Sequence, residues 1–300
     1  MLDFNKIYEK RIDCILDTDT YNEIDDQFAL SFLLKNEKDL NLLGVTITPF
    51  LNNKTPGVKE SIELSYNEVL KVLELCNKKN YFDKVYKGST SFLSDSNSFV
   101  KSDACDFIIE TSKHYNKDNK LFLVGIGALT NIASAIIKDP TIVDRIAVVW
   151  LGGSAYHYYI NSEFNMRQDI IAARVVMSIV DDFVLLPCQG VVSEFITTEC
   201  ELRNYLLGHG KLADYLCMNT INYAHDIIKI KTWSKAIWDV CAVALLLNKN
   251  NKYMLVRQRQ LRLPSLTEPI YEEKQDKKIY YVEKIYRDRL MLDLFEAISE

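Results

Sequence analysis

The stretch that decides the fold lies at residues 15–30 and reads ILDTDTYNEIDDQFAL. Its apolar start, preceded by Cys14, predicts a short buried strand, because continuous apolar runs of this length are typical of strands inside a covered sheet. Asp17 and Asp19 then follow on a turn. Helix capping does not account for carboxylates at the end of a strand, so this pair favours a metal site.

A second acidic pair stands where a helical pattern begins, near Ile24. Asp25 and Asp26 fall in the first turn, where acidic side chains commonly cap a helix and complement its dipole. On their own they favour this structural role. Together with Asp17 and Asp19, however, they repel one another unless a cation lies among them. Oxygen ligands favour a hard cation such as Ca²⁺ or Mg²⁺.

The bulk composition is that of a globular protein and excludes several classes of function. The chain has 300 residues, of which 48% are hydrophobic and 26% charged, which is ample for one α/β domain with a large core. A net charge of −5 without a basic stripe argues against nucleic acid as a partner. No apolar segment is long enough to cross a membrane, and residues 1–6 lack the apolar core of a signal peptide. We therefore expect a cytoplasmic protein with no membrane partner.

The seven cysteines are widely spread and include no C-x-x-C pair. This spacing argues against a zinc knuckle and against a thiol–disulfide redox motif. Several of them, such as Cys188 and Cys241, stand in apolar runs, where a free cysteine behaves as a small hydrophobic residue. We expect reduced cysteines in a reducing compartment.

Apolar runs and helical patterns alternate along most of the chain. After the first run, strand-like runs lie at residues 42–48, 121–124, 146–151 and 183–186. Helical spacing is found at residues 61–76, 129–137 and 169–179. This alternation predicts a single α/β domain over residues 1–300, with a predominantly parallel central sheet and helices on both faces. Residues 253–281 combine charge with β-forming residues and predict a late hairpin or edge strands.

Three turns follow the carboxyl ends of predicted strands, which is where ligands bind in open α/β sheets. They are the turn that carries Asp17 and Asp19 and the glycine-containing turns at residues 125–127 and 152–153. We expect these turns to converge on one crevice.

With these features the chain resembles the inosine-uridine nucleoside hydrolase family. The resemblance runs from Asp17 to residues 293–295 and rests on four blocks that occur in the family's order. They are the acidic stretch at 17–26, GIGALTN at 125–131, LGG at 151–153 with EFN at 163–165, and WD at 238–239 before an apolar helix at 240–247. The resemblance implies a nucleoside hydrolase-like fold and Ca²⁺-dependent hydrolysis of the N-glycosidic bond of ribonucleosides, which gives ribose and free base.

By this resemblance, Ca²⁺ is held by the carboxylates of Asp19, Asp26 and Asp239 and by the backbone carbonyl of Ile126. Three carboxylates and a carbonyl form the oxygen-only set that Ca²⁺ prefers, with positions left for a water and two ribose hydroxyls. The glycines on either side of Ile126 lack a Cβ, and we expect this freedom to let the turn aim its carbonyl inward. For Asp239 alone, a helix N-cap is an equally good interpretation.

The resemblance also implies roles for the other polar residues. Asp25 corresponds to the family's general base, which takes a proton from a water that Ca²⁺ makes more acidic. Asp17 orients its neighbours without contacting the metal. Glu163 and Asn165 match the residues that bind the ribose hydroxyls, since a carboxylate accepts hydrogen bonds and an amide both donates and accepts them.

The sequence departs from the family's pattern in three places. The loop at residues 20–24 is two residues longer than the common form, which has Pro-Gly in the turn. His157 stands six residues before Glu163, where many members have an Asn that holds the 5′-hydroxyl. A histidine there either hydrogen-bonds the same hydroxyl or lies at the surface. Trp238 replaces a His that is a candidate acid for the departing base.

A tryptophan cannot protonate a base, but it can stack on one. In this respect Trp238 resembles the purine-preferring branch of the family, so we expect purine nucleosides to be favoured. The alternative is that Trp238 is a core aromatic. Candidate second faces of an aromatic sandwich are Phe92, Tyr156, Tyr158 and Tyr159, and candidate alternative acids are His209 and His225.

Two further expectations follow from the family. Asn52 or Asn53 lies after a strand end where members often supply an Asn to the ribose. Relatives are often dimers or tetramers, which implies a homo-oligomer whose substrate is a small nucleoside.

Two other classes compete with this interpretation. Haloacid-dehalogenase-like phosphatases also begin with an apolar strand followed by Asp-x-Asp-x-Thr, with Mg²⁺ and a nucleophilic Asp. Here the Thr two places after Asp19 is missing, and the acidic pair Asp181–Asp182 precedes a predicted strand instead of following one. The third class is an inert relative that binds a ribosyl ligand without hydrolysis, which the replaced His and Asn favour and the intact carboxylates oppose.

Overall fold

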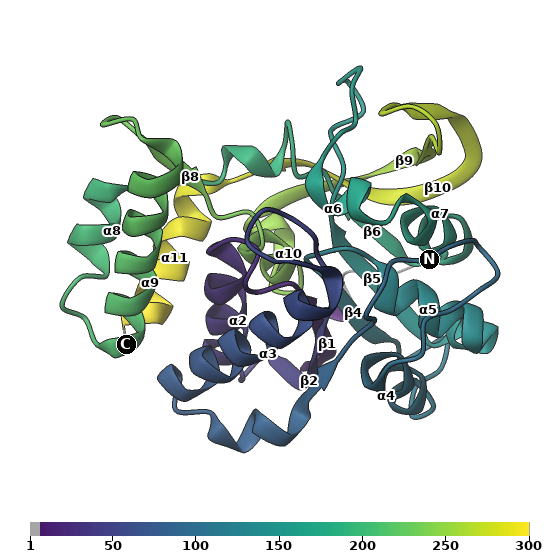
Figure 1. Ribbon diagram of the computed structural model, residues 1–300, viewed down its shortest axis with the longest axis horizontal. Coiled ribbons are helices and arrows are strands. Elements are labelled where there is room, and N and C mark those ends of the chain that lie inside the picture. The colour runs from purple at the N-terminus through teal and green to yellow at the C-terminus, as the bar shows by residue number, and fades with distance from the viewer. Residues whose placement is uncertain (1–6, 300) are drawn as a thin grey trace.

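The computed structural model describes residues 7–299 and contains an eight-stranded sheet at its centre (Figure 1). The strand order is β3-β2-β1-β4-β5-β6-β10-β9. These strands are β1 (Ile12–Thr18), β2 (Leu40–Ile47), β3 (Val85–Lys87), β4 (Leu121–Gly125), β5 (Ile146–Leu151), β6 (Phe183–Leu186), β9 (Met254–Pro264) and β10 (Tyr271–Ile285). Two short strands, β7 (Ile196–Thr198) and β8 (Ser234–Ala236), form a separate antiparallel pair.

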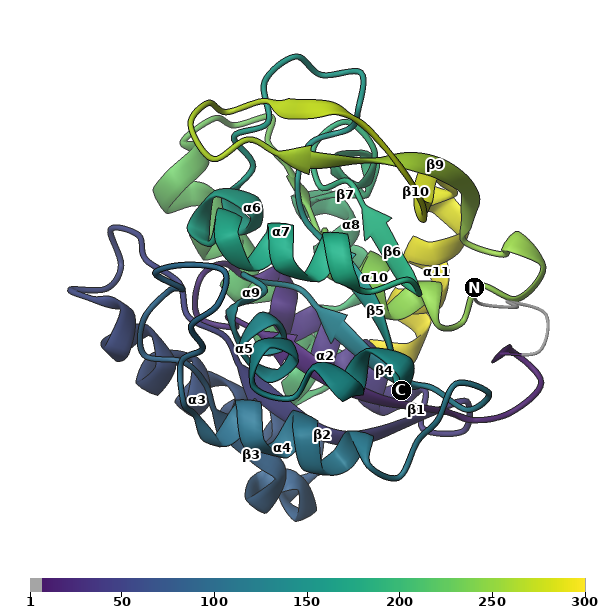
Figure 2. The ribbon, with the colours of Figure 1, turned by 90° about the vertical axis from the view of Figure 1, so that its right-hand side faces the viewer.

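The large sheet is parallel except at one edge, where β9 runs antiparallel to β10. β10 itself pairs in parallel with β6, so the long β9–β10 hairpin extends the sheet beyond β6 (Figure 2). The predicted parallel sheet and the predicted late hairpin are therefore confirmed. The inner strands are buried on both faces, which explains their continuous apolar runs.

Helices cover the two faces of the sheet and enclose two hydrophobic cores. One face is covered by α2 (Asp25–Lys35), α3 (Val58–Leu75), α10 (Val240–Leu245) and α11 (Arg287–Ser299). The other is covered by α4 (Asp103–Ser112), α5 (Thr130–Lys138) and α7 (Ile170–Ile179). α8 (Glu199–Tyr205) and α9 (Lys211–Tyr223) pack on α11 at one end of the molecule (left in Figure 1), and α6 (Phe164–Gln168) precedes α7. Within residues 7–299, none of the helices has the length and apolar character needed to span a membrane.

Short helical segments connect these elements. They comprise 3₁₀ turns at Lys79–Lys84, Pro140–Asp144, Val192–Glu194 and Lys249–Asn251, and a π-helical turn at Ala224–Ile228 that continues α9.

The carboxyl ends of the central strands lie side by side in the sheet. Asp17 of β1 pairs with Gly125 of β4, and Gly125 pairs with Trp150 of β5. The turns after these strands therefore leave the sheet at one edge, called here the carboxyl edge, and the opposite end is called the amino edge. The carboxyl edge is where the ligand site of a parallel α/β sheet is expected.

Candidate active site

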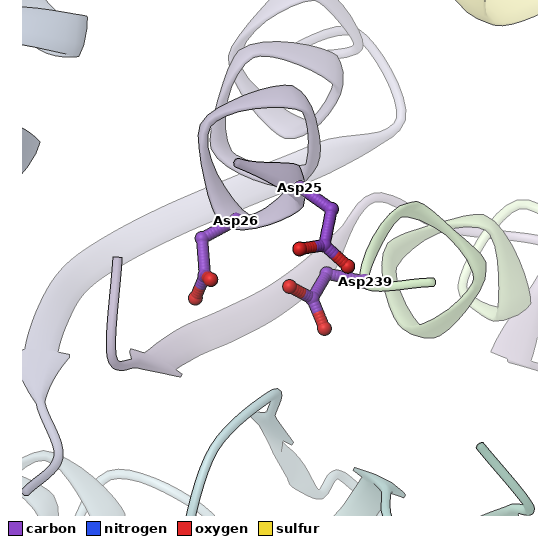
Figure 3. A group of neighbouring side chains, drawn as sticks. All are labelled: Asp25, Asp26 and Asp239. Carbon is purple, nitrogen blue, oxygen red and sulfur yellow. The ribbon is translucent and has the colours of Figure 1, made fainter. Parts of the chain in front are cut away.

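Three carboxylates meet at the carboxyl edge (Figure 3). Asp25 and Asp26 come from the first turn of α2, and Asp239 stands directly before α10. Each offers a carboxylate oxygen within 4.8 Å of the others, although the side chains are only 2–4% exposed. Burying like charges this closely is unfavourable unless protons or a cation compensate for them.

Helix capping does not explain these residues. The N-cap of α2 is Ile24, and Asp239 at the N-cap of α10 makes no side-chain capping hydrogen bond. The capping alternative is thus not what the structure shows for Asp239, whose carboxylate faces the two acids of α2 instead (Figure 3).

The other two acids of the opening stretch lie beside this cluster. Asp17 is held by its surroundings, because its Oδ1 accepts hydrogen bonds from Thr46 Oγ1 at 2.7 Å and Asn131 Nδ2 at 2.8 Å. Asp19 is 1% exposed, and its Oδ2 has no hydrogen-bond partner among the described residues. A buried carboxylate oxygen without a donor is an expected feature of a cation site.

Gly127 permits the turn after β4 to approach Asp19. A Cβ at this position would lie 2.5 Å from Thr48 Cγ2 and 3.1 Å from Asp19 Cγ. Neither Gly125 nor Gly127 has a positive φ, so close approach, and not the backbone freedom expected from the sequence, makes glycine necessary at Gly127.

The electrostatics of the cluster also favour a cation. Burial raises the pKa of Asp17 and of Asp26 to about 7. Burial raises the pKa of Asp19 and of Asp239 well above the usual range, and the neighbouring carboxylates raise both further. The donor set contains only oxygen, and its carboxylates lie close enough to repel one another when ionised. These residues therefore fit a hard divalent cation.

Glu163 and Asn165 form a connected pair after β5. Glu163 caps α6, and its carboxylate accepts hydrogen bonds from the backbone N–H groups of Gly153 at 2.6 Å, Met166 at 2.9 Å and Asn165 at 3.0 Å. The Asn165 amide donates to the carbonyl oxygens of Ile126 and of Leu151, both at 3.0 Å. The Ile126 carbonyl retains a second lone pair, since a carbonyl oxygen accepts two hydrogen bonds or ligands.

A cavity of about 300 Å³ opens on these groups. Its lining includes the predicted residues Asp19, Asp25, Asp26, Asn52, Ile126, Glu163, Asn165, Trp238 and Asp239. Asn52 donates from Nδ2 to Asn22 Oδ1 at 2.8 Å. Trp238 presents a buried indole N–H without a hydrogen-bond partner among the described residues. The structure thus brings together most of the residues selected from the sequence.

Some predicted residues lie elsewhere. His157 is exposed, its ring packs against that of Tyr158 at 4.9 Å, and it does not line the cavity. His209 is exposed, and His225 contacts Glu199 of α8 at 3.2 Å. The sequence around these histidines does not show that they lie outside the cavity, because only the fold determines which loops reach it.

The aromatic residues expected to complete a sandwich are also absent from the lining. Tyr156 packs instead against Tyr271 and Tyr281 of β10, with ring centroids 5.0 and 4.8 Å apart. The aromatic residues that line the cavity with Trp238 are Phe164 and Tyr223.

Several lining residues were missed by sequence reasoning. They are Asn22, Glu23, Lys54, Leu151, Phe164, Cys188, Gln189 and Tyr223. Two of them, Asn22 and Glu23, belong to the lengthened loop, so its extra length was a usable signal. The buried Lys235 contacts Glu23 and Trp238 and was missed as well, although it lies only three residues before the WD block.

The parallel fold, the acidic cluster at its carboxyl edge and the adjoining polar pair define an α/β protein with a ligand site suited to a hard cation. The model of the family described as inosine-uridine preferring nucleoside hydrolase matches residues 14–277. The chain therefore belongs to this family, whose members act on ribonucleosides.

Individual relatives agree with this assignment. A probable uridine nucleosidase 2 of Arabidopsis thaliana is 25% identical over 221 residues, which is 68% of this chain and 67% of the relative. The structure of a plant nucleoside hydrolase superposes with a TM-score of 0.75 at 17% identity, covering 96% of this chain and 99% of the other. The structure of a purine-preferring ribonucleoside hydrolase from Gardnerella vaginalis superposes with a TM-score of 0.72 at 21% identity, covering 96% of this chain and 98% of the other. These comparisons do not favour the haloacid-dehalogenase-like alternative.

Proposed function

We propose that this protein is a Ca²⁺-dependent hydrolase of the N-glycosidic bond of purine ribonucleosides. The observation that carries the proposal is the buried acidic cluster, which opens on a cavity that also presents hydroxyl-binding and aromatic side chains. Family membership supports ribonucleosides as the substrate class. Purines are proposed because three aromatic side chains that can stack on a base, Trp238, Phe164 and Tyr223, line the cavity.

In this proposal the carboxylates have separate tasks. Asp19, Asp26, Asp239 and the Ile126 carbonyl would hold the cation. When bound, Ca²⁺ would acidify a water and orient the ribose diol. Asp25 accepts the proton of the attacking water, and the surrounding carboxylates stabilise positive charge that develops on the ribose ring. Asp17, fixed by Thr46 and Asn131, keeps the turn after β1 in place.

Glu163, Asn165 and Asn52, which also line the cavity, would bind ribose hydroxyls. Glu163 accepts three backbone hydrogen bonds, so its carboxylate is fixed before any substrate arrives. Such preorganisation lowers the cost of orienting the ribose. His157 is not part of the proposed site, because it does not line the cavity.

The test is a panel of nucleosides incubated with the purified protein, with and without EDTA. We expect inosine, adenosine and guanosine to release free base with Ca²⁺ present, and the chelator to abolish the reaction. Release of phosphate from nucleotides without free base would overturn the proposal. Binding of a ribose analogue without any base release would instead identify an inert relative.

We also propose that the protein acts in the cytoplasm as a homodimer or homotetramer. The free cysteines in the described structure support a reducing compartment. Light scattering coupled to size exclusion tests the oligomer, and a monomer at micromolar concentration would contradict it. Fractionation of the source cells tests the location.

A further inference from the structure

Lys235 is an unusual residue for its position. Among residues 7–299 it is the only lysine or arginine whose side chain is buried, with 4% exposure. It lies on β8, and its Nζ is 2.7 Å from Glu23 Oε2 and donates to the Ala236 carbonyl at 2.9 Å. Burying an ammonium group costs several kcal/mol unless nearby groups compensate for it, so the groups around Lys235 indicate what its charge does.

The same ammonium group lies on the indole of Trp238. Nζ is 3.9 Å from the ring centroid, well within the distance of a cation–π interaction. Trp238 lines the cavity and Lys235 does not. The ammonium therefore contacts an aromatic side chain of the cavity wall without belonging to the lining itself.

Glu23 connects this pair to a second aromatic residue of the cavity. Tyr223 Oη donates to Glu23 Oε1 at 3.1 Å, while Glu23 Oε2 faces Lys235. Glu23 belongs to the lengthened loop at residues 20–24. The additional residues of this loop thus provide the anionic partner of the buried lysine, next to the wall formed by Trp238 and Tyr223.

We propose that Lys235 is a positioning residue for the departing base, acting through Trp238. This proposal rests on the proposed function. As the bond between ribose C1′ and the base nitrogen breaks, its electron pair moves onto the base, which then takes a proton from solvent water. The ammonium on the indole makes the ring less electron-rich, and this stabilises the negative charge that develops on a base stacked against the ring. None of the chain's four histidines lines the cavity, so the charge of Lys235 replaces the missing acid.

The decisive experiment compares two ribosides whose leaving groups differ in how much stabilisation of negative charge they need. Lys235→Met keeps most of the length of the side chain and removes its charge. We expect kcat for inosine to fall by about 100-fold, as for the loss of one preorganised electrostatic group. For 4-nitrophenyl β-D-ribofuranoside, whose nitrophenolate departs without assistance, we expect a much smaller loss. Lys235→Arg should restore part of the inosine activity. Equal losses for both ribosides would overturn the proposal.

A matched control is available at the amino edge. Lys120 also forms an ion pair with a buried acid, with Nζ 2.9 Å from Asp182 Oδ2. Lys120→Met should lower stability and leave the ratio of the two turnover rates unchanged. Lys54→Met tests the exposed lysine that does line the cavity. A selective inosine defect in that variant, with none in Lys235→Met, would also overturn the proposal.

Binding experiments separate this proposal from the proposed function. If the wild type cleaves neither riboside, the proposed function fails. The role of Lys235 is then tested by calorimetry with urate, a purine that is anionic at pH 7, and neutral hypoxanthine. We expect Lys235→Met to weaken the binding of urate more than the binding of hypoxanthine. An unchanged affinity ratio in a folded variant would overturn the role of Lys235, and Glu23→Gln provides a second variant if Lys235→Met does not fold.

Discussion

The two edges of the central sheet carry cavities of very different character. The amino-edge cavity is the larger one, about 540 Å³ against about 300 Å³ at the carboxyl edge, and it is also lined by charged residues. Its acids have partners, however. Asp13 accepts hydrogen bonds from Asn41 at 2.7 Å and from Tyr115 at 2.9 Å, and Asp182 pairs with Lys120. At the carboxyl edge, by contrast, the carboxylates of Asp25, Asp26 and Asp239 are buried within 4.8 Å of one another.

This difference teaches that cavity size does not identify the site. Acids that are paired or exposed have small net effects on stability, so they need no further ligand. Acids that are buried beside one another destabilise the folded protein unless a ligand compensates for them. The carboxyl-edge cluster is therefore the place where cation binding and folding are coupled.

The largest expected effect comes from Asp25→Asn. Loss of the proposed general base should lower kcat for inosine by about 10³-fold, within the range for general base catalysis. Ca²⁺ affinity, measured by calorimetry, should change little if Asp25 only accepts the proton. Asp25 also lies within 4.8 Å of Asp26 and Asp239, so ligation is the competing role. A loss of Ca²⁺ binding equal to that of Asp239→Asn would assign Asp25 as a ligand instead.

The second prediction concerns the stability of the metal-free protein. Burial raises the pKa of Asp17 and of Asp26 to about 7 in the folded state, against about 3.9 in an unfolded chain. The folded protein then binds protons that the unfolded chain releases. Their contribution is complete below about pH 4 and is lost as pH rises through 7. Thermal melts in EDTA should therefore show a lower Tm at pH 8 than at pH 5.

Calcium should reverse this trend, because it binds the ionised carboxylates of the folded state. We expect saturating Ca²⁺ to raise Tm strongly at pH 8 and little at pH 5. A Tm in EDTA that does not depend on pH over this range would show that the cluster carries no uncompensated charge. The carboxyl edge would then not differ from the amino edge.

Much of the fold can be predicted from the sequence, because the apolar pattern of a strand or helix is visible within a short stretch of residues. The continuous apolar runs at residues 146–151 and 183–186 coincide with β5 and β6. The acidic turn was placed at a strand end by the same reasoning, and Asp26, Ile126 and Asp239 meet at the cavity. Family resemblance was needed for Asp239, since its own surroundings in sequence are equally typical of a helix N-cap.

The remaining features depend on contacts between distant segments. Lys235 is a lysine like many others in the sequence, and only folding places it between Glu23 and Trp238. Tyr223 was not selected, whereas Tyr156 was, because nothing local distinguishes a tyrosine of the cavity from one packed against β10. β3, α8 and α11 were not predicted either, since short or highly charged segments give weak periodic signals.

The third prediction concerns the aromatic wall of the carboxyl-edge cavity. Trp238→Ala should lower kcat/KM for inosine and guanosine by about tenfold to 100-fold, the range for loss of one stacking partner of a base. Uridine should be less affected, because a pyrimidine has a smaller stacking surface. Trp238→Phe keeps an aromatic face and should retain most of the purine activity. Equal losses for purines and uridine in Trp238→Ala would remove the argument for purine preference.

The smallest effect is expected at the amino edge, from Asp13→Asn. This change keeps the shape of the side chain but places an N–H group where Asn41 or Tyr115 now donates. Loss of one such hydrogen bond at a half-buried residue should lower the free energy of unfolding by about 1 kcal/mol, as measured by urea titration. Turnover of inosine and the Tm shift on adding Ca²⁺ should equal those of the wild type. If Asp13→Asn changed either one, the amino edge would be coupled to the site, and the contrast between paired and unpaired acids would not identify where the protein works.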